Sequence, residues 1–364
     1  MGRILILANF DLGLYKFRKD LIAELMKEGN EIYISLPYGK LVEPLKKMGC
    51  IFLDTSVDRR GINPVTDGKL FFCYIKMIRK IRPDYIISYT IKPNIYGGIA
   101  AAISKVPYAL NITGLGTAFQ KDGFVKKLVC FLYKTTCRKA HTVFFENEDN
   151  RRTFLKYHLV NEEKTYRLNG AGINLEEYPY TPYPEIEDEI RFLFIGRIMK
   201  EKGVDELFEA ARKIRNQYPQ AVFELVGLYE DDYKERIEQL EKEGVVRFYG
   251  YQEDVRPFIA KAHCFVLPSY HEGMANTLLE SAAMCRPLIT SRIHGCMEAV
   301  EDGKSGYLVR VKDSDELEEK IRDFIELDWM QKERFGIRSR EIMEEKFEKG
   351  MVVGETVTAI KQNK

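Results

Sequence analysis

Short apolar runs alternate with amphipathic, helix-like segments along almost the whole chain, and this alternation constrains the fold more than any other feature. Runs such as RILILA at 3–8 and RFLFIG at 191–196 are largely apolar, which is typical of strands buried on both faces of a parallel sheet. Strand–helix–strand alternation places helices on both sides of such a sheet, so we predict an α/β fold. The predicted strands span 3–8, 31–36, 84–88, 107–111, 142–145, 191–196, 221–226, 245–249, 263–267 and 287–290. The predicted helices span 18–28, 66–81, 94–104, 122–139, 204–217, 230–243, 276–284, 314–326 and 329–345.

The alternation is interrupted at 178–189, YPYTPYPEIEDE, where three prolines and an acidic run replace it. A chain of 364 residues is longer than one ordinary domain. We place a linker there and predict two Rossmann-like domains, 1–177 and 190–345, with a C-terminal helix in 346–364 that packs back on the first. Ligands bind outside the carboxyl ends of strands in open parallel sheets, so we expect both domains to face a central cleft.

The formal net charge of +1 conceals an asymmetry between the two halves. Residues 1–172 carry a net charge of +12, and residues 173–364 carry −11. A basic half favours an anionic partner, such as a membrane surface or a phosphorylated acceptor; the alternative is that the two halves dock on each other. The acidic half argues against a nucleic-acid-binding module.

The cysteine pattern and the length of the apolar runs bear on the cellular compartment of the protein. Seven dispersed cysteines contain no CxxC pair and no zinc spacing, and no signal peptide precedes the first strand, so we expect reduced thiols in the cytoplasm. No apolar run approaches the roughly 18 residues of a membrane span.

The segment 268–287, PSYHEGMANTLLESAAMCRP, follows a predicted strand and opens a predicted helix. Glu272 precedes the first turn, and Glu280 lies eight residues further on, within the helix. Free amide groups in a first helical turn bind anions, and Gly273 lets the backbone approach a ligand closely. Carboxylates at these two positions can accept hydrogen bonds from sugar and ribose hydroxyls. The alternative is an ordinary helix start with two solvated glutamates.

The segment 194–203, FIGRIMKEKG, ends another predicted strand. Gly196 permits a tight turn there, and Arg197 and Lys202 follow it. Two cations above a strand end suit a diphosphate, which an arginine can bind with two hydrogen bonds. Together with the helix start at 276, they favour a nucleoside diphosphate-sugar site.

These residues together resemble the retaining glycosyltransferases of family 4, which have the GT-B fold. The resemblance is carried by Gly196-Arg197, Lys202-Gly203, Glu272-Gly273 and Glu280, and it covers essentially the whole chain. It implies that Arg197 and Lys202 bind the donor diphosphate, that Glu272 contacts the transferred sugar, and that Glu280 binds the ribose. It further implies donor contacts from the backbone of Met274, Ala275 and Asn276, and a base-binding edge at Gly227, Gly250 and Tyr251.

Motifs in the N-terminal half resemble one subgroup of this family. YKFR at 15–18, DRRGINP at 58–64 and NITGLGTAF at 111–119 are similar to enzymes that extend polyprenyl diphosphate-linked sugars, including bacterial N-acetylgalactosaminyltransferases of N-glycan and capsule pathways. The candidate acceptor residues are Gly13 and Arg18, which we place in the first strand–helix loop, and Gly114 and Gly116 in a second loop. An arginine at that helix start can reach an anionic group in the cleft. Many relatives carry a histidine near the donor sugar, but the comparable loop TGLGT has none.

The stretch 122–139 mixes large apolar side chains with lysines and an arginine, which is typical of a helix at a membrane surface. The candidate membrane residues are Phe124, Lys126, Lys127, Phe131 and Lys134. The alternative is that this helix covers the sheet and its lysines are solvated.

We expect no metal or other cofactor. Asp313-Ser314-Asp315 has the D-x-D spacing of metal-dependent glycosyltransferases, but it directly precedes a helical pattern, so a helix cap is expected. His271 and His294 lack ligand partners at suitable spacing, although His294 and Gly295 are candidates to line the cleft.

The sequence therefore predicts a metal-independent retaining glycosyltransferase on the inner face of the cell membrane. It transfers a sugar, with N-acetylgalactosamine favoured, from a UDP-sugar to a polyprenyl diphosphate-linked saccharide. The alternatives are a soluble family 4 transferase that uses a GDP- or ADP-sugar on a non-lipid acceptor, and a UDP-sugar epimerase of the same fold.

Overall fold

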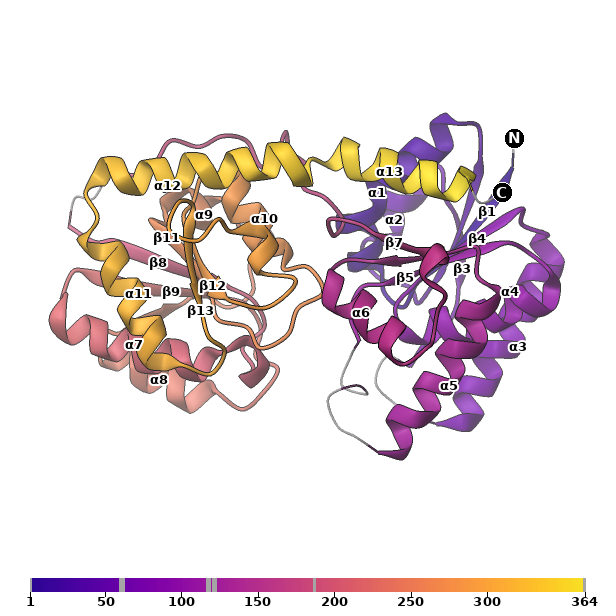
Figure 1. Ribbon diagram of the computed structural model, residues 1–364, viewed down its shortest axis with the longest axis horizontal. Helices are drawn as coiled ribbons and strands as arrows, with labels where there is room; N and C mark the ends of the chain where they lie inside the picture. Colours follow the sequence, from indigo (N-terminus) through magenta and orange to yellow (C-terminus); the bar gives the residue numbers. More distant parts are fainter. Residues whose placement is uncertain (1, 59–62, 116–118, 120–122, 186–187, 363–364) are drawn as a thin grey trace. The chain divides into compact units, whose positions relative to one another are not determined.

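The chain folds into two compact units (Figure 1), one formed by 1–172 with 349–364 and the other by 173–348. The computed structural model describes residues 2–58, 63–115, 119, 123–185 and 188–362. Each unit contains one parallel sheet with helices on both faces, which confirms the predicted pair of Rossmann-like folds.

The first unit has a seven-stranded sheet with the order β3-β2-β1-β4-β5-β6-β7. Its strands are β1 (Arg3–Leu7), β2 (Glu31–Leu36), β3 (Ile51–Asp54), β4 (Tyr85–Tyr89), β5 (Tyr108–Ile112), β6 (Thr142–Phe145) and β7 (Thr165–Arg167). Ile4 lies opposite Ile32 on one side and opposite Tyr85 on the other, both in parallel register. The strand order therefore reverses between β1 and β4.

Alternate residues of β1 enter two separate cores. Ile4 and Ile6 pack with helices α1, α2 and α13, whereas Leu5 and Leu7 pack with α3, α4, α5 and α6. Because neither face is exposed to water, the strand is apolar at successive positions and shows no two-residue alternation. The helices are α1 (Asp11–Lys27), α2 (Val42–Lys47), α3 (Pro64–Ile81), α4 (Gly98–Ser104), α5 (Phe124–Lys139), α6 (Glu148–Lys156) and α13 (Lys349–Gln362).

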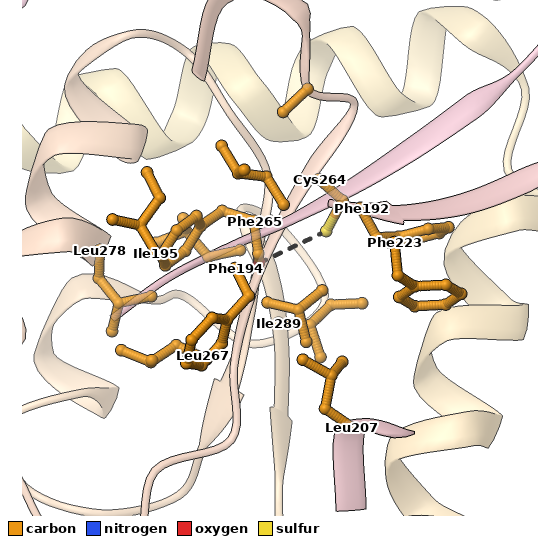
Figure 2. Packing of buried hydrophobic residues seen from close by; sticks show 14 of the residues in the cluster. Phe192, Phe194, Ile195, Leu207, Phe223, Cys264, Phe265, Leu267, Leu278 and Ile289 are labelled. Carbon is orange, nitrogen blue, oxygen red and sulfur yellow. Dashed lines mark hydrogen bonds between the residues drawn. The ribbon is translucent and has the colours of Figure 1, made fainter. Parts of the chain in front are cut away.

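The second unit has a six-stranded sheet with the order β10-β9-β8-β11-β12-β13, again parallel throughout. Its strands are β8 (Ile190–Ile195), β9 (Ala221–Val226), β10 (Val246–Phe248), β11 (Cys264–Leu267), β12 (Leu288–Ser291) and β13 (Gly306–Val309). Its helices are α7 (Val204–Gln217), α8 (Lys234–Lys242), α9 (Arg256–Lys261), α10 (Asn276–Ala283), α11 (Ser314–Glu326) and α12 (Trp329–Ile342). Figure 2 shows its aromatic core, where the rings of Phe192 and Phe223 stack with centroids 5.0 Å apart. The order reverses between β8 and β11.

Several short elements were not predicted. The strands β3, β7 and β13 lie at sheet edges and contain only three or four residues each, and the first two are only partly buried. The helices α2 and α9 contain six residues each, too few to display a helical period. Helix α6 was also missed.

The segment predicted as a linker packs on the second unit. The hydroxyl of Tyr183 donates to the His263 carbonyl at 3.0 Å, Arg286 donates to the Pro182 carbonyl at 2.9 Å, and Trp329 donates to the Pro184 carbonyl at 3.2 Å. Arg286 and Trp329 thus satisfy two backbone carbonyls of this proline-rich segment, and Tyr183 of the segment satisfies one carbonyl of the unit. The division between the units falls earlier, after Gly172, and the chain re-enters the first unit at Lys349.

Candidate active site

Three glycines lie together where β8, β9 and β10 end. The amide of Gly227 donates to the Gly250 carbonyl at 2.9 Å, and a Cβ atom at Gly227 would lie 1.8 Å from the Gly196 carbonyl oxygen. Gly227 has φ +157, so both its conformation and its neighbour require glycine. The structure thus brings Gly227 and Gly250 of the predicted base-binding edge together with Gly196 of the predicted diphosphate segment. Tyr251 follows them with an exposed side chain.

Lys202 and Glu272 meet at the position where the strand order reverses. Lys202 follows β8 and Glu272 follows β11, and the Lys202 Nζ to Glu272 Oε1 distance is 2.5 Å. The hydroxyl of Ser269 donates to the same oxygen at 2.7 Å. Both charged side chains are largely buried, with 19% and 11% of their areas exposed. A cation and a carboxylate are therefore held together at the edge where open parallel sheets bind ligands.

Backbone contacts fasten the two loops that carry this pair. The amide of Tyr270 donates to the Glu201 carbonyl at 2.8 Å. Gly203 has φ +71, and a Cβ atom there would lie 2.0 Å from the Pro268 carbonyl oxygen. This close approach explains the glycine that follows Lys202.

Arg197 is held less firmly than Lys202, because 55% of its side chain is exposed. Its Nη1 lies 3.6 Å from Glu230 Oε2, which makes a loose ion pair. Exposed pairs of this kind contribute little to stability, so the guanidinium can exchange Glu230 for another anion at small energetic cost.

The loop before α10 is braced from the side. The amide of Ala275 donates to the Gly295 carbonyl at 2.9 Å, and a Cβ atom at Gly295 would lie 2.5 Å from the Gly273 carbonyl oxygen. The carboxylate of Glu298, which sequence reasoning missed, accepts from the Gly295 amide at 2.7 Å and pairs with His294 Nδ1 at 2.7 Å. His294 and Gly295 thus support the 272–275 loop.

Met274 and Ala275 are buried, and α10 begins at Asn276. Ala275 provides no side-chain cap for this helix. The Ala275 amide, predicted to contact the donor, is already bonded to the Gly295 carbonyl. The amide groups suited to an anionic group of a ligand are therefore those of the helical turn that begins at Asn276.

Glu280 lies within α10 and is 9% exposed. Its carboxylate contacts the hydroxyl of Tyr178, and burial together with Glu280 raises the pKa of that tyrosine. The sequence carried no signal for Tyr178, which lies in the segment predicted to be a linker.

The predicted acceptor residues are arranged differently from the expectation. Helix α1 begins at Asp11, so Gly13 and Arg18 lie inside the helix and not in a loop. The carboxylate of Asp11 accepts from the Leu12 amide at 2.9 Å and from the Leu41 amide at 2.8 Å, which stabilises the first turn of the helix. Glycine lowers helix stability only modestly, so the helix continues through Gly13.

Arg18 is buried and paired inside the first unit. Its Nη2 donates to Glu146 Oε1 at 2.5 Å. Burial raises the pKa of Glu146, whereas Arg18 and Lys349 oppose the rise. Gly114 follows β5, and a Cβ atom there would meet no described atom within 4 Å. Gly116 lies outside the described residues.

The first two turns of α5 project apolar side chains into solvent. Phe124 is 79% exposed and Phe131 is 67% exposed, and the buried residues of the helix all come after them. Lys127 and Lys134 are exposed as well, whereas the Lys126 ammonium lies 4.9 Å from the centre of the Tyr157 ring. Among the described helices, none is long and apolar enough to cross a membrane.

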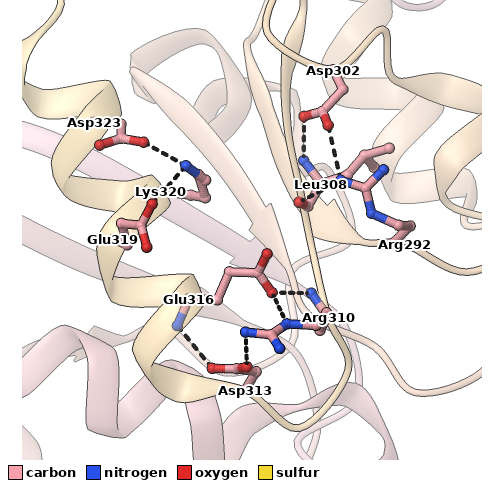
Figure 3. Close-up of polar contacts among 9 residues, drawn as sticks. All are labelled: Arg292, Asp302, Leu308, Arg310, Asp313, Glu316, Glu319, Lys320 and Asp323. Carbon is pink, nitrogen blue, oxygen red and sulfur yellow. Dashed lines mark hydrogen bonds and ion pairs between the residues drawn. The ribbon is translucent and has the colours of Figure 1, made fainter.

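The Asp313-Ser314-Asp315 sequence forms the predicted helix cap. Figure 3 shows the Asp313 carboxylate accepting from the Glu316 amide, at 2.9 Å, at the start of α11. Arg310 lies 2.8 Å from the other oxygen of Asp313 and 2.9 Å from Glu316. The described part of the chain contains no group of three or more side chains suited to hold a metal ion.

Two family models together match most of the chain. The model described as glycosyl transferases group 1 matches 182–342, and the model described as glycosyl transferase 4-like matches 3–147. The protein is a glycosyltransferase of these families. The transferase is 29% identical over 341 residues, 89% of each chain, to the N,N'-diacetylbacillosaminyl-diphospho-undecaprenol alpha-1,3-N-acetylgalactosaminyltransferase of Campylobacter jejuni.

Other relatives extend this comparison. The transferase is 27% identical, over 70% of each chain, to the UDP-Gal:alpha-D-GlcNAc-diphosphoundecaprenol alpha-1,3-galactosyltransferase of Escherichia coli. Among solved structures, HepE of Anabaena in complex with UDP and glucose has a TM-score of 0.81 at 18% identity, with 99% of this chain and 100% of that chain covered. This likeness confirms the predicted GT-B fold.

Proposed function

We propose that the protein transfers an N-acetylhexosamine, with N-acetylgalactosamine favoured, from a UDP-sugar to a polyprenyl diphosphate-linked saccharide in cell-surface glycan assembly. The observation that carries this proposal is the Lys202–Glu272 pair beside the uncapped start of α10, at the switch point of the second sheet. The names of the Campylobacter and Escherichia relatives, which act on undecaprenyl diphosphate-linked sugars, support the acceptor class.

The arrangement suits a reaction that retains the anomeric configuration. The acceptor hydroxyl attacks the face of the anomeric carbon from which the diphosphate departs, and its proton passes to the leaving phosphate. Arg197 and Lys202 stabilise the growing negative charge, and the first turn of α10 adds its amide groups. Glu272 is already hydrogen-bonded to Lys202 and Ser269, which suits a carboxylate that orients sugar hydroxyls. Two cations and a helix start can neutralise a diphosphate, so we propose that no metal is required.

We also propose that the protein attaches peripherally to the inner face of the cell membrane, where a polyprenyl acceptor keeps its lipid. The exposed Phe124 and Phe131 on α5, together with the net charge of +12 on residues 1–172, support this attachment. Shallow apolar insertion and attraction to anionic lipid act together on such a helix.

The test is a transfer assay with paired panels of donors and acceptors. UDP-N-acetylgalactosamine, UDP-N-acetylglucosamine, UDP-galactose, GDP-mannose and ADP-glucose are each offered with undecaprenyl diphosphate carrying N,N'-diacetylbacillosamine or N-acetylglucosamine. We expect transfer from a UDP-N-acetylhexosamine, an α-linked product by NMR, and retained activity in EDTA.

Each alternative gives a different result in the same assay. With a lipid-free saccharide added as a third acceptor, transfer from a GDP- or ADP-sugar to that saccharide would identify a soluble transferase. Release of a free UDP-linked epimer without acceptor would identify an epimerase. Loss of activity in EDTA that Mg²⁺ or Mn²⁺ restores would overturn metal independence alone.

A further inference from the structure

Three elements of the first unit bring polar side chains together at the carboxyl edge of its sheet. Arg18 occupies the buried face of α1, where Leu14 and Leu21 are its apolar neighbours along the helix. Its Nη2 lies 2.5 Å from Oε1 of Glu146, the residue that follows β6. Its guanidinium carbon lies 4.8 Å from the ring centre of Tyr89, the last residue of β4.

This ion pair is nearly buried, but it is not sealed from solvent. The side chain of Arg18 is 10% exposed and that of Glu146 is 12% exposed. A buried ion pair is weak support for stability, because well-packed apolar residues in its place are often equally stabilising or better. Stability alone therefore does not account for the pair, and its small solvent-facing edge leaves it able to contact a ligand.

Two consecutive residues, Tyr89 beside the pair and Thr90 directly after it in the chain, have hydroxyl groups with unused hydrogen-bonding capacity. The Tyr89 hydroxyl and the Thr90 Oγ1 are both buried, and neither has a hydrogen-bond partner among the residues that the structure describes. Tyr89 is 5% exposed, so only a small part of its side chain faces solvent. Buried polar groups are nearly always hydrogen-bonded, which makes two adjacent exceptions an indication of a ligand.

The backbone at Thr90 supports the same conclusion. Thr90 has φ +73, in the left-handed region that β-branched residues rarely adopt. Its carbonyl accepts from the Asn94 amide at 2.9 Å, ahead of a π-helical turn at Pro93–Gly97. Strained residues and π turns are concentrated at binding and catalytic sites. Thr90 also follows β4, which neighbours β1 at the point where the strand order reverses.

We propose that Tyr89, Thr90 and Glu146 form a subsite for the terminal sugar of the acceptor, with Arg18 as the positioning residue. This inference rests on the proposed transfer to a lipid-linked saccharide. Glu146 accepts hydrogen bonds from sugar hydroxyl or acetamido groups, and the two hydroxyls of the protein donate to or accept from the same sugar. Arg18 holds the carboxylate in place.

The charge of the pair determines the class of ligand. Glu146 neutralises Arg18, and Lys349, which also acts on Glu146, lies 3.9 Å from Asp20 Oδ2. The cluster therefore offers no net positive charge to a diphosphate, and an anion there would meet the Glu146 carboxylate. Arg18 also covers the Tyr89 ring, so hydrogen bonding and not stacking provides recognition. A neutral, hydroxyl-rich saccharide satisfies both conditions. This role replaces the expectation that Arg18 reaches an anionic group.

The decisive variant is Tyr89→Phe, which removes one hydroxyl that has no partner in the described part of the chain. We expect the KM for the lipid-linked acceptor to rise roughly three- to tenfold, the scale of one lost hydrogen bond, with the KM for the UDP-sugar and the melting temperature unchanged. Tyr85→Phe is the matched control, because Tyr85 is buried in the same strand at its opposite end. It should leave both KM values unchanged.

A second variant tests the carboxylate. Glu146→Gln preserves size and should raise the acceptor KM by about ten- to a hundredfold, because a charge-assisted hydrogen bond is lost, while donor KM stays constant. An unchanged acceptor KM in Tyr89→Phe, or equal increases for donor and acceptor, would overturn the subsite even where the wild type transfers to lipid-linked sugars. A wild type that accepts no lipid-linked saccharide would overturn the proposed function and the subsite together.

Discussion

At the scale of single residues, the candidate catalytic cations of the second unit are both paired with carboxylates, but to different degrees. Lys202 is held by Glu272, whereas Arg197 is mostly exposed and only loosely paired with Glu230. A preorganised cation stabilises a departing diphosphate without having to reorganise during the reaction. Lys202 is therefore held more rigidly than Arg197, a difference that the sequence motif containing both residues does not show.

We predict that Lys202→Ala and Arg197→Ala each lower kcat/KM for the donor by roughly 10²–10³, the scale of losing one preorganised charge donor. Lys200→Ala is the matched control, since Lys200 is exposed in the same turn. Steady-state kinetics at subsaturating UDP-sugar provide the measurement. A Lys202→Ala or Arg197→Ala enzyme as active as Lys200→Ala would contradict the assigned role.

A buried histidine gives the second unit a pH-dependent stability. His263 is 2% exposed; its Nδ1 accepts from the Arg191 amide at 2.9 Å, and its Nε2 faces the Glu185 carbonyl at 3.2 Å. Burial, reinforced by the nearby cations Arg191, Arg286 and Lys332, lowers the pKa of His263 to about 4. Between about pH 4 and pH 6.5 the imidazole of His263 is therefore neutral in the folded state and mostly protonated in the unfolded chain.

We predict that the free energy of unfolding falls by up to about 3 kcal/mol as the pH decreases from 6.5 to 4, because the unfolded state binds a proton that the folded state excludes. Above pH 6.5 this contribution is constant. Urea denaturation across this range, compared with His263→Gln, measures the effect. The variant should lose the additional slope whatever its absolute stability, and an identical slope in both proteins would refute the assignment.

At the scale of elements, α5 is divided into two parts with different surroundings. Its C-terminal half buries Tyr133, Thr136 and Cys137, while its N-terminal half exposes Phe124 and Phe131. The helix is thus anchored at one end and presents apolar and basic side chains at the other, as interfacial helices do. This division favours the membrane interpretation over that of a helix which merely covers the sheet.

We predict that Lys127→Glu/Lys134→Glu abolishes pelleting with anionic vesicles at low salt, since each basic residue near an anionic leaflet contributes about 1 kcal/mol. Phe124→Ser/Phe131→Ser should weaken pelleting at all salt concentrations. Lys234→Glu/Lys242→Glu, an equal charge change on exposed positions of α8, is the control.

Transfer assays separate membrane binding from catalysis in these variants. Transfer to a long-chain acceptor should slow in both α5 variants, whereas transfer to a short water-soluble analogue should not. If both acceptors were affected equally, α5 would have a structural role.

At the scale of the whole molecule, the chain ends in the unit where it began. Helix α13 packs against α1, and its buried Val352, Val357 and Ile360 belong to one of the two cores of the first unit. The buried ammonium of Lys349 donates to the Ala171 carbonyl at 2.8 Å, which fastens the start of α13 beside the end of the first segment. The core of the first unit is therefore incomplete without α13.

We predict that Ile360→Ala lowers the stability of the first unit by about 2–4 kcal/mol, the usual loss for a truncated core isoleucine. Gly354→Ala, on the exposed side of the same helix with no atom within 4 Å of a new Cβ, should instead stabilise it by up to about 1 kcal/mol. Urea denaturation should show both shifts in the transition of the first unit. Equal stability of the two variants would mean that α13 is not part of its core.

The sequence by itself determined the features that depend on neighbouring residues. Apolar runs predicted the long strands, the position before the α11 pattern predicted the Asp313 cap, and the two glycine-bearing motifs located Arg197, Lys202 and Glu272. Tertiary structure alone decided which distant groups meet. Lys202 and Glu272 are 70 residues apart and pair because β8 and β11 are neighbours, while Arg18 and Glu146 are 128 residues apart and pair because α1 covers the end of β6. The sequence pattern of a segment indicates which of its apolar side chains are buried. The partner of a buried charge depends instead on the order of the strands in the sheet, which the sequence pattern of a single segment does not contain.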